Sequence, residues 1–314
     1  MRTFEGFMHG INLGGWLSQC VSYDKKHFDT FITEENIKQI AGWGLDHVRV
    51  PVDYDVMITD DGIWKEEGLS HLYDVISWCK TYHLNMVLDL HKTKGYMFDK
   101  DAVANPDLFF QQKDLQDFFV MIWKEFATRF GKESDMLAFE LLNEIVNPDY
   151  AKVWNDIALR AIREIRAVAP EAYILVGGVN YNNVRSIPQI LMPVDDKIVY
   201  NFHCYEPMCF THQKAHWMPE MTENCEYPPC PELFDELFDE AVKVCEERNV
   251  PLYCGEYGVI DQAPTAGSLE WIKDISAAFD KYQIGRSLWN YKDKDFGLIG
   301  EHYASVMKEM IKCL

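Results

Sequence analysis

The stretch LAFELLNE, residues Leu137–Glu144, is almost continuous in apolar residues and ends on a carboxylate. A second stretch, VPLYCGE at Val250–Glu256, has the same form. Such runs, bounded by polar or turn residues, predict strands of a parallel sheet that is buried on both faces. Ligands bind at the carboxyl ends of such strands. We therefore expect the fold to bring Glu144 and Glu256 together.

Short apolar runs alternate with amphipathic helical segments along the whole chain. The predicted strands span residues 9–13, 46–52, 85–90, 136–143, 173–176, 197–202, 251–255 and 284–289. The predicted helices span residues 33–43, 69–82, 113–130, 150–168, 184–190, 232–248, 269–282 and 303–311. Alternation of this kind, without a linker or a low-complexity segment, predicts an α/β fold: a (β/α)8 TIM barrel that forms one domain over residues 1–314.

The main alternative fold is a doubly wound open sheet, which would need a glycine-rich phosphate loop after a strand. The nearest candidate, GINLGG at 10–15, has the wrong glycine spacing and no acidic ribose partner in register. The barrel is therefore the better interpretation. Residues 204–231 are rich in proline and are predicted to form a long irregular loop, which in a compact domain is usually functional or disordered.

The overall charge disfavours several classes of partner. A net charge of −20 over 314 residues argues against nucleic acid and against anionic membranes, because both attract basic surfaces. A neutral substrate is therefore expected. Aromatic residues make up 14% of the chain, which suits stacking on sugar rings as well as core packing.

The nine cysteines show no CxxC spacing of a zinc or redox site. Free thiols in this number suggest a reducing or anoxic environment. The sequence shows no N-terminal signal segment and no apolar stretch long enough to span a bilayer. We expect a monomer without cofactor or metal, either cytoplasmic or secreted with its leader removed.

Polar side chains and one large aromatic residue fall where the predicted strands stop. A barrel would gather them into one cleft at its carboxyl face, where enzymes of this fold carry their catalytic residues. The set is Arg49, His91, Asn143, Glu144, His203, Tyr205, Glu256 and Trp289.

This set resembles the signature positions of the family 5 glycoside hydrolases, a family of retaining cellulases and mannanases with barrel folds. No signature position is missing, and the resemblance covers the whole chain. Flanking motifs are similar to the clostridial endoglucanase C type: GINLGGW at 10–16, FDTFI at 28–32, YNFH at 200–203, FTHQKAHW at 210–217 and LYCGE at 252–256. In one departure, residues 204–231 are short where that type is expected to carry a helical insertion, so subsites built there are expected to differ.

The resemblance implies a retaining endo-β-1,4-glucanase that cleaves soluble cellulose and mixed-linkage β-glucan by double displacement. Glu144 would be the general acid/base and Glu256 the nucleophile. The acid must stay protonated near neutral pH, and the nucleophile must stay ionised. Arg49 and Tyr205 are the candidates that would support the ionised nucleophile.

The resemblance also implies roles in sugar binding. Asn143 would bind the sugar 2-hydroxyl, and Trp289 would stack beneath the ring. His91 and His203 would position the sugar and tune the two glutamates. Weaker candidates for sugar contact lie on loops: Trp16, Trp64, Phe210, Trp217, Lys292 and Asp295.

Three alternatives stay open at this point. A β-mannanase of the same family would use the same reaction centre. A metal-dependent barrel could use His91, Glu144, His203 and Glu256 as ligands, although neither HxH nor HExxH spacing is present. A carbohydrate-binding barrel without activity is disfavoured, because both glutamates are intact.

Overall fold

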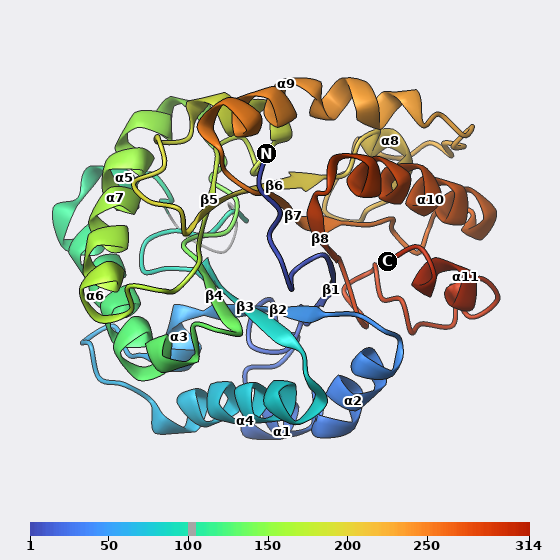
Figure 1. Cartoon of the computed structure of the whole chain (residues 1–314). Helices are drawn as coiled ribbons and strands as arrows, with labels where there is room; N and C mark the ends of the chain where they lie inside the picture. The colour runs from blue at the N-terminus through green and yellow to red at the C-terminus, as the bar shows by residue number, and fades with distance from the viewer. Residues whose placement is uncertain (100–104) are drawn as a thin grey trace.

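The computed structural model describes residues 1–99 and 105–314, and in these residues eight parallel strands close into a barrel in the order β1-β2-β3-β4-β5-β6-β7-β8. The predicted TIM barrel is therefore confirmed, and Figure 1 shows the helices as a ring around it. The strands are β1 (His9–Asn12), β2 (His47–Asp53), β3 (Asn85–Lys92), β4 (Leu137–Glu140), β5 (Ile174–Gly177), β6 (Ile198–Cys204), β7 (Leu252–Tyr257) and β8 (Gly285–Leu288).

The longer helices carry apolar stripes that pack on the strands, and shorter ones lie in the loops. The longer helices are α2 (Glu34–Gly42), α4 (Glu66–Tyr82), α6 (Lys113–Phe130), α7 (Ala151–Val168), α9 (Glu232–Arg248) and α10 (Thr265–Tyr282). The shorter ones are α1 (Lys25–Thr30), α3 (Tyr54–Met57), α5 (Leu108–Gln111), α8 (Met208–Thr211), α11 (Met307–Ile311) and the 3-10 turns η1 (Gly131–Glu133), η2 (Pro148–Tyr150) and η3 (Val184–Gln189).

Several predicted boundaries were wrong for local reasons. The short helices α1, α3, α5 and α8 were missed, since a single turn or two shows no periodic apolar face. The predicted helix at 184–190 is the 3-10 turn η3, which contains Pro188, a residue without an N–H for helical bonding. The predicted strand 136–143 ends as a strand at Glu140. None of the described helices is long and apolar enough to cross a membrane.

A bulge in β7 positions one of the two key glutamates. Phe202 pairs with Cys254, but the next residue, His203, pairs with Glu256, so Gly255 is the extra residue. A β-bulge re-aims the side chains that follow it, and here it turns Glu256 toward the barrel axis. Gly255 fits because a Cβ there would lie 2.8 Å from Asn201 Oδ1.

The N-terminal segment closes the end of the barrel opposite the site. The rings of Phe4 and Phe7 stack with centroids 4.1 Å apart and pack against inward residues of five strands, among them Val87 and Tyr253. Figure 1 shows this blue segment crossing the ring of strands. This N-terminal plug, which contains Phe4 and Phe7, lies close to β8. A Cβ on Gly285 would lie 2.2 Å from the Phe7 carbonyl oxygen.

We predict that Gly285→Ala lowers the free energy of unfolding by about 1–3 kcal/mol, since the added methyl overpacks the plug against backbone. The measurement is urea denaturation followed by tryptophan fluorescence. Gly42→Ala is the matched control: it lies at the end of α2 with nothing within 4 Å of an added Cβ, so no loss is expected. Equal stability of the two variants would contradict the plug contact.

Candidate active site

Arg49 lies at the centre of the site, fully buried inside the barrel. Its Nε and Nη2 donate to the two oxygens of Glu140 at 2.7 and 2.8 Å, a bidentate pair that fixes the plane of the guanidinium. Its Nη1 donates to Glu256 Oε1 at 2.7 Å, and Nη2 lies 2.9 Å from Asp89 Oδ2. One cation therefore joins carboxylates from β3, β4 and β7.

Glu256 is held from two sides and is only 6% exposed. Arg49 binds one of its oxygens, and the hydroxyl of Tyr205 donates to the other, Oε2, at 3.0 Å. His203 Nδ1 lies 3.7 Å from the same Oε2. The carboxylate is thus fixed in orientation by two donors, with Tyr205 reaching it from the half-buried start of the loop after β6.

Glu144 lies in the irregular segment after β4 and has a φ of +34°. A positive φ is uncommon for a residue with a side chain, and such strain is found at functional sites. The Tyr96 hydroxyl secures this backbone: it donates to the Glu144 carbonyl oxygen at 2.7 Å and accepts from Val146 N at 2.8 Å. The Glu144 carboxylate, in turn, lies 2.8 Å from His203 Nδ1 through Oε1.

The two glutamates have different electrostatic surroundings. Burial raises the pKa of Glu144 well above its usual range, and the negative charge of Glu256 raises this pKa further. Burial also raises the pKa of Glu256. Arg49 opposes the rise at both glutamates, but it donates directly only to Glu256. These directions favour Glu256 as the ionised member of the pair and Glu144 as the protonated one.

His91 is a fully buried neighbour of the pair. Its Nδ1 bonds Asp89 Oδ2 at 2.6 Å, and its Nε2 lies 2.8 Å from the Gln19 side-chain nitrogen. Burial lowers the pKa of His91 to about 4 and raises the pKa of Asp89 to about 7. The imidazole is therefore neutral at pH 7, and its orientation is fixed by the two partners.

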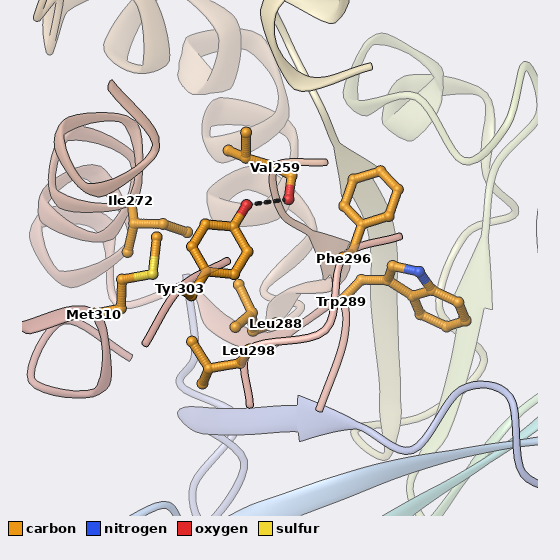
Figure 2. A pocket seen from close by; sticks show the side chains of 8 residues that line it. All are labelled: Val259, Ile272, Leu288, Trp289, Phe296, Leu298, Tyr303 and Met310. Atoms are coloured by element: carbon orange, nitrogen blue, oxygen red, sulfur yellow. Dashed lines mark hydrogen bonds between the residues drawn. The ribbon is translucent and has the colours of Figure 1, made fainter. Parts of the chain in front are cut away.

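Trp289 follows β8 and lies nearly parallel to His91, with ring centroids 5.9 Å apart. It is only 5% exposed, so any sugar surface on it is narrow. Figure 2 shows its indole pointing away from an apolar cavity behind β8 that also contacts Phe296 and Leu298. That cavity, of about 10 Å³, is too small for a sugar and is packing space.

Asn143 and His203 each have one side-chain atom that no described residue bonds. Asn143 Oδ1 accepts from Arg49 Nη2 at 3.0 Å, but Asn143 Nδ2 and His203 Nε2 have no partner within the described part of the chain. Burial lowers the pKa of His203 well below its usual value. Buried polar atoms are normally satisfied, so these two are suited to meet substrate hydroxyls.

These contacts bring the eight predicted positions together. The structure changes the assessment of the four aromatic residues that were weaker candidates for sugar contact. Trp16 and Phe210 are completely buried, so the expectation that they contact sugar was wrong. Trp64 packs against Phe126 of α6, with ring centroids 5.6 Å apart, and so lies away from the site. Trp217 is 45% exposed and stays a candidate.

The two charged candidates on the β8 loop engage other groups. The Lys292 ammonium lies 4.3 Å from the centre of the Phe31 ring. The Asp295 carboxylate lies 3.8 Å from His216 Nε2. Their expected sugar contacts stay predictions.

Sequence reasoning missed residues that support the site from behind. Glu140 and Asp89 lie inside predicted strands. A charged residue in a buried strand indicates an ion-pair partner, and this signal could have identified both residues. Asn12 Oδ1 accepts a hydrogen bond from Arg49 Nη1 at 2.9 Å. This contact could not be predicted, because it depends on how the barrel closes. Tyr96 lies in the loop after β3, where no periodic pattern marks it.

The proposed metal ligands come together only in part. Ligand atoms of Glu144, His203 and Glu256 lie within 4.8 Å of one another. His91 does not join them, because its two nitrogens face Asp89 and Gln19. The site is therefore better described as a carboxylate pair that shares one imidazole.

Two buried carboxylates at the carboxyl end of a TIM barrel are the groups that a glycoside hydrolase requires, and comparison with known proteins gives the family. Residues 9–295 match the model of the cellulase family, glycosyl hydrolase family 5. The chain belongs to this family, and the resemblance predicted from the sequence is confirmed. It is a hydrolase of β-1,4-glucanase or cellodextrinase type.

Two named relatives cover nearly the whole chain. The chain is 42% identical over 294 residues to cellodextrinase A of Ruminococcus flavefaciens, covering 91% of this chain and 86% of that protein. It is 37% identical over 339 residues to endoglucanase C of Acetivibrio thermocellus, covering 98% of each. A solved hyperthermophilic endo-β-1,4-glucanase in complex with substrate matches with a TM-score of 0.85 at 22% identity, over 98% of this chain and 96% of that one. At that identity the likeness shows the fold.

We predict that Tyr96→Phe lowers kcat by roughly ten- to hundredfold, because small displacements of a catalytic group are costly. The substitution leaves the Val146 N–H and the Glu144 carbonyl without their shared partner, and Glu144 then shifts. KM should change little, so steady-state kinetics on an aryl cellobioside separate the two effects.

Tyr82→Phe is the control for Tyr96→Phe, since Tyr82 also donates to one group, Glu34 Oε1 at 3.0 Å, but does so on the exposed surface of α4. It should behave like the wild type. A Tyr96→Phe variant with lower thermal stability but unchanged kcat would show that the bridge does not position Glu144.

Proposed function

We propose that this chain is a retaining β-1,4-glucanase in which Glu144 is the general acid/base and Glu256 the nucleophile. The separation of the two carboxylates carries the proposal: one oxygen of each lies within 4.8 Å of the other. Retaining enzymes hold their carboxyl groups about 5–5.5 Å apart, and inverting enzymes need about 6.5–9.5 Å to admit a water. The narrow gap supports direct attack by a carboxylate.

In the first displacement, Glu256 attacks the anomeric carbon while Glu144 gives its proton to the departing glycosidic oxygen. The carbon–oxygen bond to the leaving chain breaks as the bond to Glu256 forms. Arg49 and Tyr205 keep Glu256 ionised and aimed. The pKa of Glu144, raised by burial and by the charge of Glu256, supplies the proton near neutral pH.

In the second displacement, Glu144 acts as a base. Once Glu256 is esterified its negative charge is gone, so the pKa of Glu144 falls and the carboxylate can accept a proton from water. The water oxygen attacks the anomeric carbon, and Glu256 leaves as a carboxylate. The sugar therefore retains its anomeric configuration after two inversions.

The free buried donors suit a sugar between the two glutamates. The unpartnered Asn143 Nδ2 supports the assignment of this residue to the 2-hydroxyl, a contact that strengthens as the transition state forms. The rings of His91 and Trp289 lie nearly parallel with their centroids 5.9 Å apart, and Trp289 is our candidate for stacking on the sugar. Because these residues follow strand ends, the barrel itself positions the groups that would hold the central sugar.

Action within a glucan chain needs binding surfaces beyond the central sugar, and the structure offers several. Tyr181 is 42% exposed, its backbone N donates to Ile145 O at 3.0 Å, and the charge of Glu144 contributes to its raised pKa. Trp217 adds a second exposed ring after β6. A hollow of about 430 Å³ lies beside Tyr96 and Val146 and is lined by further aromatic residues, including Phe98 and Tyr150. These surfaces favour an endo-acting enzyme on soluble β-1,4 and mixed-linkage glucans over one confined to short cellodextrins.

A side-by-side product analysis tests this substrate assignment. We expect rapid cleavage of carboxymethyl cellulose and barley β-glucan, with a steep early fall in viscosity, and slow cleavage of laminarin and galactomannan. Chelator should leave the rates unchanged. Fast cleavage of the mannan alone would favour the β-mannanase alternative, and action on cellodextrins without loss of viscosity would favour a cellodextrinase.

We predict that Glu144→Ala lowers kcat/KM by about 10²–10⁴-fold on substrates with poor leaving groups, and far less on a dinitrophenyl cellobioside, which needs no proton. In the wild type, kcat/KM falls on the alkaline side as Glu144 loses its proton; with the activated substrate the variant should lose this alkaline limb. The pH–rate profile measures both effects. An unchanged alkaline limb would assign the acid to another residue.

A further inference from the structure

The segment after β6 flanks the catalytic pair and is held by contacts of its own. Tyr205, which binds Glu256, begins it, and α8 follows. Ile260 N donates to the Thr211 carbonyl at 2.9 Å, which fastens α8 to the loop after β7. Beyond α8 the chain carries the exposed Trp217, whose ring lies 6.5 Å from that of Phe296.

Two thiols face each other across this segment. Cys209 Sγ on α8 lies 3.0 Å from Cys225 Sγ, with Cys209 exposed and Cys225 half-buried. Gln213 holds the two ends in register: its side-chain nitrogen donates to the Cys225 carbonyl at 3.0 Å, and Cys225 N donates to Gln213 Oε1 at 3.3 Å. Gln213 itself is buried, so these two hydrogen bonds are shielded from water and hold Cys225 beside α8.

We propose that Cys209 and Cys225 form a reversible disulfide that fastens the segment carrying Trp217 beside the active site. A disulfide needs its sulfurs about 2.05 Å apart, so closure requires a movement of roughly 1 Å, which side-chain rotation supplies. Other exposed thiols, such as Cys230, have no sulfur neighbour within hydrogen-bonding reach in the described residues.

The step balances with a small-molecule disulfide, such as oxidised glutathione, as the oxidant. The Cys209 thiolate attacks one sulfur of that disulfide, and one small thiol leaves. Cys225, after losing its proton, attacks the Cys209 sulfur of the mixed disulfide, and the second small thiol leaves with that proton. Cys209 is exposed and Cys225 is half-buried, so Cys209 is the thiol that the oxidant reaches first.

The cross-link would act on both stability and binding. It closes a loop between residues 209 and 225, which constrains the unfolded chain. It also holds Trp217 in place before substrate arrives, so less ordering is needed on binding. Neither effect requires the bond to touch the catalytic residues.

The test is incubation of the full chain in glutathione buffers from reduced to oxidised, followed by alkylation and peptide mapping. We expect a linked Cys209–Cys225 peptide that dithiothreitol removes. The oxidised protein should melt roughly 5 °C higher and show an about two- to tenfold lower KM for cellohexaose at similar kcat. Cys209→Ser and Cys225→Ser should abolish these changes, and Cys230→Ser should preserve them.

Absence of the linked peptide under oxidising conditions, or a link that uses Cys230 in its place, would overturn the proposal. A linked protein with unchanged KM would overturn its role at the site. Peptide mapping does not depend on the proposed activity, so a protein that cleaved no glucan would still give a clear result for the cross-link.

Discussion

The rest of the site depends on one buried cation facing several buried carboxylates. Arg49 contacts Asp89, Glu140 and Glu256 at 2.7–2.9 Å from inside the barrel. Removing one member of such a buried group leaves an uncompensated charge, which typically costs 3–5 kcal/mol. Because its partners come from β3, β4 and β7, the same guanidinium that orders the barrel interior also orients the Glu256 carboxylate. Arg49 therefore contributes both to the stability of the barrel and to the geometry of the site.

One positive charge cannot fully compensate several buried carboxylates, and this imbalance makes their pKa values differ. Burial raises the pKa of Asp89 to about 7 and that of Glu140 in the same direction, while Arg49 opposes both. Glu256 has direct contact with Arg49, whereas Glu144 has the imidazole of His203 and the repulsion of Glu256. In the proposed mechanism, the two glutamates divide into nucleophile and acid because only Glu256 bonds the Arg49 guanidinium, and not because the two side chains differ.

The sequence was sufficient for the barrel and for the residues at its strand ends, because buried parallel strands are continuous apolar runs and their polar ends stand out. It could not place Tyr96, which acts through a hydroxyl in a loop without periodicity. It also could not show that Gly255 is a bulge residue, since register is set by pairing with β6. Trp16 and Phe210 were misjudged because an aromatic residue on a predicted loop can still be fully buried by its neighbours.

Trapping the covalent intermediate shows which glutamate is the nucleophile. An activated 2-deoxy-2-fluoro cellobioside slows both displacements and allows the glycosyl-enzyme to accumulate, and peptide mass mapping then locates the sugar. We expect a single glycosyl ester on Glu256, released on incubation with an acceptor sugar. A label on Glu144, or hydrolysis with inversion and no label, would contradict it.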